Sequence, residues 1–195
     1  IFRGNQNKLK RIDAIKFPNS LGLFAGFITQ YLGFRSNHDE YKVMGLAAYG
    51  KPSIDLSTIL KFENGDLEFN PKVLHPEVMK RYPVFHTSQL PMFRDTSFSS
   101  LPPHRIPGRK LLPEHKNLAA SAQKVIEEAI FAIVKKYKTE KDTHLCIAGG
   151  VAENSLANGK LAQSGLFQDI YVPPACNDAG SALGASLLIA TKHSF

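Results

Sequence analysis

The strongest constraint on the fold is an alternation of apolar helices and short strands over the last third of the chain. An apolar helical stripe over 117–137 precedes a predicted strand, Leu145–Ala148, and a predicted helix from about Glu153 to Ser164. A second strand, Asp169–Val172, leads into a helix that starts near Asp178. Short links between such elements are typical of a parallel sheet, so the sequence predicts an α/β fold.

The first 70 residues contain weaker patterns of the same kind. A partial period-two alternation over Arg11–Phe17 predicts a strand. Ser20 is a suitable N-cap for a buried helix that ends near Gly33, because apolar residues recur at three-to-four spacing between them. Asn64-Gly65, between two apolar runs at 59–62 and 67–69, predicts a hairpin turn.

The segment from Pro71 to Pro113 has a different composition. Eight of the twelve prolines lie in it, so regular structure should be sparse there. Such a segment can be a lid over a substrate or an inert surface excursion, and the sequence does not choose between them.

A glycine pair follows the first predicted strand of the α/β region. Gly149-Gly150 lets the backbone approach a ligand, and the next helix offers free N–H groups that suit a phosphate. Asn154 and Asn158 are four residues apart and could both offer amides to the same pocket. The motif is neither a Walker loop nor a dinucleotide fingerprint, so by itself it is a weak signal of nucleotide binding.

Asp178 follows the second predicted strand. In one interpretation it caps a helix whose small residues, including Gly180 and Gly184, allow close packing. In the other, its carboxylate lies at the carboxyl end of a parallel strand and holds a divalent cation that bridges phosphates. The glycine turn and Asp178 would then share one edge of the sheet.

Lys42 lies in the segment Glu40–Gly50 (EYKVMGLAAYG). It could be a counter-charge for phosphate, or it could pair with Glu40 on the surface, and physical reasoning leaves both open. No two of the seven histidines are spaced four apart, so a complete metal site within this chain is not expected.

Composition limits the classes of function. The net charge of +7 is scattered, without the aromatic-interleaved basic stripe of single-strand binders, so no nucleic-acid partner is expected. No apolar run is long enough to span a membrane. Cys146 and Cys176 are expected to be buried, inert thiols of a cytoplasmic protein. Because the chain begins with Ile1, it is expected to be part of a longer polypeptide.

Five segments together resemble the NodU/CmcH-type O-carbamoyltransferases and occur in that family's order. They are Ser20–Phe34 (SLGLFAGFITQYLGF), Glu40–Gly50, Asn117–Glu128 (NLAASAQKVIEE), Ala148–Gly159 (AGGVAENSLANG) and Pro173–Ala185 (PPACNDAGSALGA).

The resemblance implies that residues 1–195 form one lobe, the second, of an amino-terminal domain with the actin-like, ribonuclease H-like fold, a mixed sheet with packed helices. The proline-rich stretch at about 71–115 would be an insertion. The first lobe and a carbamoyl-adenylate-forming domain would lie outside this chain, so the chain alone is expected to be inactive. The implied reaction makes carbamoyl-adenylate from carbamoyl phosphate and ATP, then transfers the carbamoyl group to a hydroxyl of a sugar or other small-molecule acceptor.

By the same resemblance, Gly149, Gly150 and Asn154 would contact the adenylate, and Lys42 would belong to the nucleotide-binding set without an assigned role. Asp178 would be a ligand of a divalent metal, iron or magnesium, whose histidine ligands lie outside this chain. Glu153 stands where a smaller or apolar residue is usual. No membrane partner is implied, and a homodimer is an assembly to test.

Two alternatives stay open. One is the same fold acting on a tRNA adenosine or as a protein-directed carbamoyl carrier, against which the segment Glu40–Gly50 favours the small-molecule branch. The other is a nucleotide-binding module without catalysis.

Overall fold

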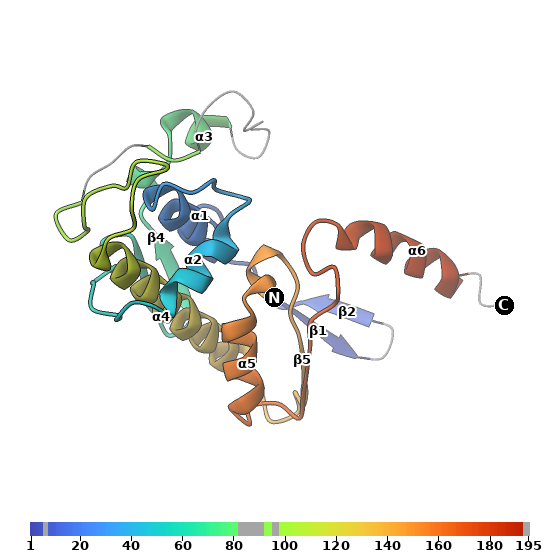
Figure 1. Ribbon diagram of the computed structural model, residues 1–195. Helices are drawn as coiled ribbons and strands as arrows, with labels where there is room; N and C mark the ends of the chain where they lie inside the picture. The colour runs from blue at the N-terminus through green and yellow to red at the C-terminus, as the bar shows by residue number, and fades with distance from the viewer. Residues whose placement is uncertain (6–7, 82–91, 95–97, 193–195) are drawn as a thin grey trace. The chain divides into compact units, whose positions relative to one another are not determined.

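The computed structural model describes residues 1–5, 8–81, 92–94 and 98–192, and the chain divides into two compact units, 1–132 and 133–195. Figure 1 shows a mixed α/β protein, and the described strands form three separate two-stranded sheets. One continuous mixed sheet, as expected for an actin-like lobe, is therefore not seen among the described residues. In the same part of the chain, no helix is both long and apolar enough to cross a membrane.

The chain begins with an antiparallel hairpin. Strand β1 (Phe2–Asn5) pairs with β2 (Lys8–Arg11), and Phe2 lies opposite Arg11. The strand predicted over Arg11–Phe17 is wrong beyond its first residue, since residues 12–17 are irregular. The partial alternation there did not continue into a hydrogen-bonded ladder, and the pairing uses the polar residues that precede it.

Helix α1 (Leu21–Tyr31) has the predicted boundaries. The Ser20 hydroxyl accepts a hydrogen bond from the Leu23 amide, which confirms the N-cap. At the other end Gly33 has φ +70°, and its amide and that of Phe34 donate to the carbonyls of Gln30 and Thr29. These two hydrogen bonds together form a Schellman motif, which confirms that the helix ends at the predicted glycine.

Helix α2 (Glu40–Ala47) packs against α1, and the next element is the predicted hairpin of β3 (Leu60–Glu63) and β4 (Asp66–Phe69). Asn64 and Gly65 both have positive φ, 51° and 79°, as a type I′ turn requires. The hairpin prediction is confirmed, because the two central residues are the types that adopt this geometry at least cost.

Helix α4 (Pro113–Tyr137) is the long predicted helix, and it begins four residues earlier than the apolar stripe because Pro113 suits the first helical turn. The segment after α2 runs along it: the Lys51 amide donates to the Asn117 side chain and the Ile54 amide to the Ser121 hydroxyl. The core of this unit consists of large side chains that are almost fully buried, Phe24, Phe27, Ile28, Leu32, Leu56, Ile59, Leu60, Phe69, Leu74, Phe93 and Leu118.

Regular structure is sparse in the described part of the proline-rich segment, as predicted. It holds a short 3-10 helix, η1 (Pro71–Val73), and α3 (Pro76–Arg81). The loop around residues 102–105 is fixed to α1, since the Tyr31 hydroxyl donates to the Pro102 carbonyl at 2.8 Å. Part of the segment lies outside the described residues, so its possible role as a lid stays a prediction.

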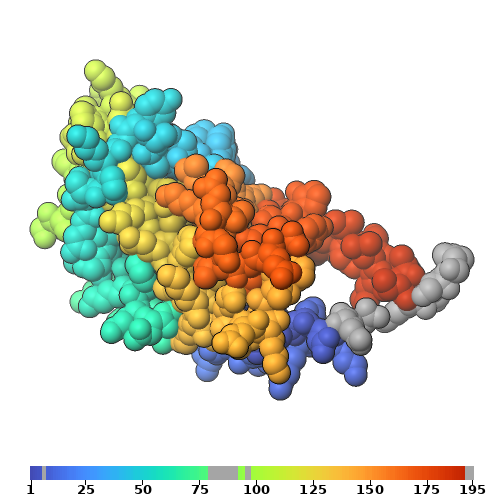
Figure 2. Space-filling model, turned by 90° about the horizontal axis from the view of Figure 1, so that it is seen from below, coloured from blue at the N-terminus to red at the C-terminus, as the bar shows by residue number. Residues whose placement is uncertain are grey.

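The second unit contains the predicted strand–helix–strand–helix order. Its elements are β5 (His144–Cys146), the 3-10 helix η2 (Gly150–Glu153), α5 (Ser155–Gln163), β6 (Asp169–Tyr171) and α6 (Gly180–Lys192). Strands β5 and β6 are parallel, and α5 contacts β6. Helix α6, red in Figure 2, carries exposed apolar side chains, and Leu187, Leu188 and Ile189 are 56, 56 and 61% exposed.

Candidate functional site

The candidate site is formed by the two turns that follow the parallel strands. The amide of Gly149, after β5, donates to the carbonyl of Cys176, after β6, at 2.6 Å. Parallel strands end at the same edge, so this hydrogen bond joins the two turns where ligands bind in open α/β sheets. The prediction that the glycine turn and the Asp178 turn share one edge is confirmed.

The two glycines differ in what they require. Gly149 has φ +100° and ψ +166°, a conformation essentially restricted to glycine. Gly150 has no positive φ, and a Cβ built there would meet no described atom within 4 Å. Among the described residues, packing thus gives no reason for a glycine at 150. What the glycine does leave is open space over the backbone, which a ligand could occupy.

Two asparagine side chains stabilise the glycine turn through hydrogen bonds to its own backbone. The side-chain oxygen of Asn154 accepts from the Ala157 amide at 3.1 Å, so Asn154 is the N-cap of α5. The Asn158 amide donates to the Ala152 carbonyl at 2.7 Å. Each side chain therefore stabilises the turn, and the prediction that both also offer amides to a ligand stays a prediction. The cap also explains why α5 begins at Ser155 and not near Glu153.

The second turn is held by Asn177 and not by the side chain of Asp178. The Asn177 side-chain oxygen accepts from the Ala179 amide at 3.0 Å, as in an Asx turn, and the Asn177 backbone carbonyl accepts from the Gly180 amide. Helix α6 begins at Gly180, and a Cβ at that position would collide with the Ala175 carbonyl. Close packing is thus the reason for Gly180, whereas a Cβ at Gly184 would meet no described atom within 4 Å.

Asp178 is exposed, and within the described ranges no group donates a hydrogen bond to its carboxylate. The helix-cap interpretation of this side chain is therefore wrong, because a cap requires its carboxylate to accept from a backbone amide of the first helical turn. A carboxylate at the strand edge that the fold does not use is consistent with the second interpretation, a ligand-facing group.

One contact across the site was not predicted. The Asn177 amide donates to the Glu153 carboxylate at 2.6 Å, a second link between the turns. The two residues are 24 positions apart, and sequence spacing gives no signal for such a pair. The only sequence signal for this contact is Glu153 itself, an acidic residue at a position of the segment 148–159 where a smaller or apolar residue is usual.

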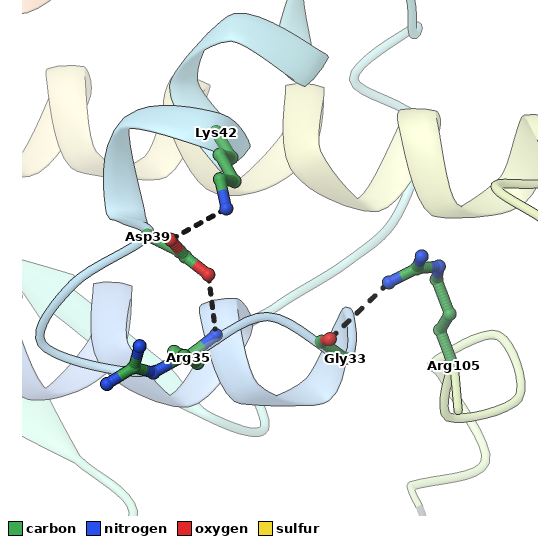
Figure 3. Close-up of polar contacts among 5 residues, drawn as sticks. All are labelled: Gly33, Arg35, Asp39, Lys42 and Arg105. Carbon is green, nitrogen blue, oxygen red and sulfur yellow. Dashed lines mark hydrogen bonds and ion pairs between the residues drawn. The ribbon is translucent and has the colours of Figure 1, made fainter. Parts of the chain in front are cut away.

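Lys42 lies in the first unit, on α2, and its contacts there are defined. Figure 3 shows its ammonium directed at the Asp39 carboxylate, with the two atoms 2.8 Å apart. The surface pairing is thus with Asp39 and not with Glu40, whose carboxylate accepts from the Asn37 amide. The Lys42 ammonium also lies 6.0 Å from the centre of the Phe34 ring.

The ion pair shifts both pKa values in the direction that favours charge. The hydrogen bond to Lys42 is the largest cause that lowers the pKa of Asp39, and a bond from the Arg35 amide adds to it. The hydrogen bond to Asp39 is likewise the main cause that raises the pKa of Lys42. A phosphate role for Lys42 would therefore compete with Asp39.

The structure does not bring a complete metal site together among the residues that it describes. Among the described residues, no three His, Cys, Asp or Glu side chains cluster as a metal site would require. Asp178 can supply one carboxylate and does not form a complete site with described neighbours.

The two cysteines differ in burial. Cys176 is buried as predicted, but the prediction that Cys146 is buried is wrong: it is exposed, because both faces of the short strand β5 are only partly covered.

Two joined turns at the carboxyl edge of a parallel strand pair lie at the position where open α/β sheets bind their ligands. The particular family follows from comparison with known proteins. A family model described as "Carbamoyltransferase N-terminus" matches residues 1–187, and the chain belongs to that family.

Curated relatives agree with this assignment. The chain is 36% identical over 185 residues to the nodulation protein NolO of Bradyrhizobium diazoefficiens, covering 91% of this chain and 30% of that protein. It is 33% identical to the nodulation protein NolNO of Sinorhizobium fredii, covering 97% of this chain and 25% of the relative. An uncharacterized Synechocystis protein, sll1178, is 36% identical with 97% and 30% coverage. The chain thus spans less than a third of the length of these relatives.

Proposed function

We propose that this chain is part of a longer carbamoyltransferase that transfers a carbamoyl group from carbamoyl-adenylate to a hydroxyl of a small-molecule or sugar acceptor. Membership of the carbamoyltransferase family over residues 1–187 supports the reaction class. The names of NolO and NolNO, both nodulation proteins, support an acceptor in natural-product or nodulation-factor-like biosynthesis. Carbamoyl phosphate and ATP would be the source of the carbamoyl-adenylate.

One observation carries the proposal: the hydrogen bond from Gly149 to Cys176, which brings the glycine turn and the Asp178 turn to one edge. Gly149 sets the shape of the turn and uses its own amide in that bond. The adenylate would therefore meet the backbone at Gly150, where glycine leaves open space, and at the start of η2. Asn154 would act through the capped start of α5, whose amides and dipole favour an anionic group.

The second turn would supply Asp178 as one ligand of a divalent cation, iron or magnesium, completed by histidines from elsewhere in the longer protein. These residues would thereby hold a positive charge beside the phosphate of the AMP leaving group, where negative charge develops as the carbamoyl group is transferred. Asp178 itself would contribute a fixed carboxylate. Lys42 would belong to the nucleotide-binding residues once its bond to Asp39 is exchanged. The chain would be one lobe of an actin-like domain in a cytoplasmic enzyme, an arrangement compatible with its α/β elements.

The test is a reaction with the longer protein, ATP, carbamoyl phosphate and a panel of hydroxyl compounds, analysed by mass spectrometry. We expect a carbamoylated acceptor and release of pyrophosphate from ATP. Nucleotide binding without pyrophosphate release or product would instead support a binding module and contradict the transferase. Carbamoylated tRNA or protein, with no small-molecule product, would contradict the proposed acceptor class.

A further inference from the structure

We propose that Glu153 is a positioning residue, which holds Asn177 and through it fixes the Asp178 turn against the glycine turn. The inference rests on the proposed function, because it assigns a task to the same site. Its starting point is the 2.6 Å hydrogen bond between the Asn177 amide and the Glu153 carboxylate. The two residues are adjacent to the groups that would contact the ligand: Glu153 ends η2, and Asn177 precedes Asp178.

The hydrogen-bonding capacities of the two side chains fit in one orientation. An ionised carboxylate only accepts, so Glu153 must face the NH₂ end of the Asn177 amide. The other end of that amide, its oxygen, accepts from the Ala179 amide. Reversing the Asn177 amide would lose both hydrogen bonds, so the network places the amide nitrogen toward Glu153 and the amide oxygen toward Ala179.

The backbone contacts around the pair show what it positions. The Asn177 carbonyl accepts from the Gly180 amide, so the residue organises the whole entry to α6, with Asp178 inside it. On the other side, η2 is fixed to Gly149, whose carbonyl accepts from the Ala152 amide. The bond between Gly149 and Cys176 joins the turns at their base, and the Glu153–Asn177 bond joins them a second time beyond it.

A single hydrogen bond allows two loops to pivot about it, whereas two bonds between different residue pairs fix their relative orientation. The second bond therefore determines where Asp178 lies relative to the open backbone at Gly150. Both Glu153 and Asn177 are exposed, so the bond adds little to global stability. Its effect should appear in the geometry of the site, to which reaction rates are sensitive.

The test is a four-way comparison in the longer protein. Asn177→Asp keeps an acceptor for the Ala179 amide but sets two carboxylates against each other. We expect this variant to lower kcat/KM for transfer at least about tenfold, with pyrophosphate release unchanged. Glu153→Gln retains an oxygen that accepts from Asn177 and should stay within about threefold of wild type.

The double variant Glu153→Gln with Asn177→Asp decides the question. The new glutamine amide can donate to the new aspartate, which restores the bond with donor and acceptor exchanged. We expect transfer to recover to within about threefold of wild type, since coupled residues show large interaction energies in such cycles. Full activity of Asn177→Asp alone, or a double variant no better than it, would overturn the inference.

Amide hydrogen exchange separates this inference from the proposed function. In Asn177→Asp we expect faster exchange at Gly149, whose amide makes the other bond between the turns, and slower exchange again in the double variant. Absence of transfer in the wild-type protein would contradict the proposed function alone, because exchange still reports the link between the turns. Exchange rates that are identical in all four proteins would overturn the inference whatever the reaction shows.

Discussion

The guanidinium of Arg105 donates to the carbonyl of Leu32 at 2.8 Å, across 73 positions of sequence. Figure 3 shows the same guanidinium directed at the Gly33 carbonyl, and the Arg105 amide donates to the Tyr31 carbonyl. The carbonyls of Thr29 and Gln30 thus have donors in the Schellman turn, and those of Tyr31 and Leu32 have donors in Arg105. The ring of Phe34 lies 5.0 Å below the guanidinium.

Arg105→Ala should therefore destabilise the first unit by about 2–4 kcal/mol, because buried carbonyls lose a charged donor. Arg105→Lys should recover only part of this, since an ammonium cannot replace both the bond to Leu32 and the bond to the Arg109 carbonyl. Thermal or urea unfolding would measure both. Arg109→Ala is the matched control, because Arg109 takes part through its backbone, and a loss as large as that of Arg105→Ala would contradict this account.

The pair of Asp39 and Lys42 predicts a defined pH dependence. The pKa of Asp39 is lowered from its ordinary value of 3.8, so its contribution is present above that pH and is lost as pH falls through the folded-state pKa. The pKa of Lys42 is raised from 10.5, so its contribution is present below that pH and is lost as pH rises through the folded-state value.

The measurement is the difference in unfolding free energy between wild type and Asp39→Asn as a function of pH. It should be constant near neutrality and shrink below pH 3.8. Lys42→Met should give a difference that shrinks above pH 10.5, with Lys110→Met as the exposed-lysine control. Differences that do not change across either limit would show that the ion pair is not formed in solution.

Gly149→Ala should mainly reduce folding stability, whereas Gly150→Ala should mainly reduce nucleotide binding. At Gly149 the φ of +100° makes alanine strained, and we expect a loss of about 1–3 kcal/mol in stability. At Gly150 a methyl group meets no described atom within 4 Å, so stability should change by less than about 0.5 kcal/mol while nucleotide binding weakens. Unfolding curves and titration calorimetry with ATP on the longer protein would measure the two effects. Unaltered ATP affinity in Gly150→Ala would argue against the proposed approach of the ligand.

Local signals predicted much of the fold. Ser20, the glycine after α1 and the Asn64-Gly65 turn each act on their immediate neighbours, so the helix ends and the hairpin followed from residue type. The parallel order of the second unit followed from the alternation of apolar periods. The strand predicted over Arg11–Phe17 failed beyond Arg11 because a short alternation does not specify a partner strand, and β1 pairs with residues 8–11 instead.

The candidate site was predicted at the level of its turns and not of its contacts. Glycine and aspartate after parallel strands indicated a shared edge, and the Gly149–Cys176 bond confirms it. The task of each polar side chain was not readable from sequence, because Asn154, Asn177 and Asp178 can all cap helices or face ligands. The structure decided between these uses through partners that are distant in sequence, as with Asn177 and Glu153.

The central claim is that the Asp178 turn acts in carbamoyl transfer, and the most direct test is Asp178→Ala in the longer protein. The matched control is Asp169→Ala, an exposed aspartate at the opposite end of β6 that pairs with His144. We predict that Asp178→Ala abolishes transfer to the acceptor while pyrophosphate release from ATP and carbamoyl phosphate continues, and that Asp169→Ala leaves both intact. An unchanged transfer rate in Asp178→Ala would contradict the account.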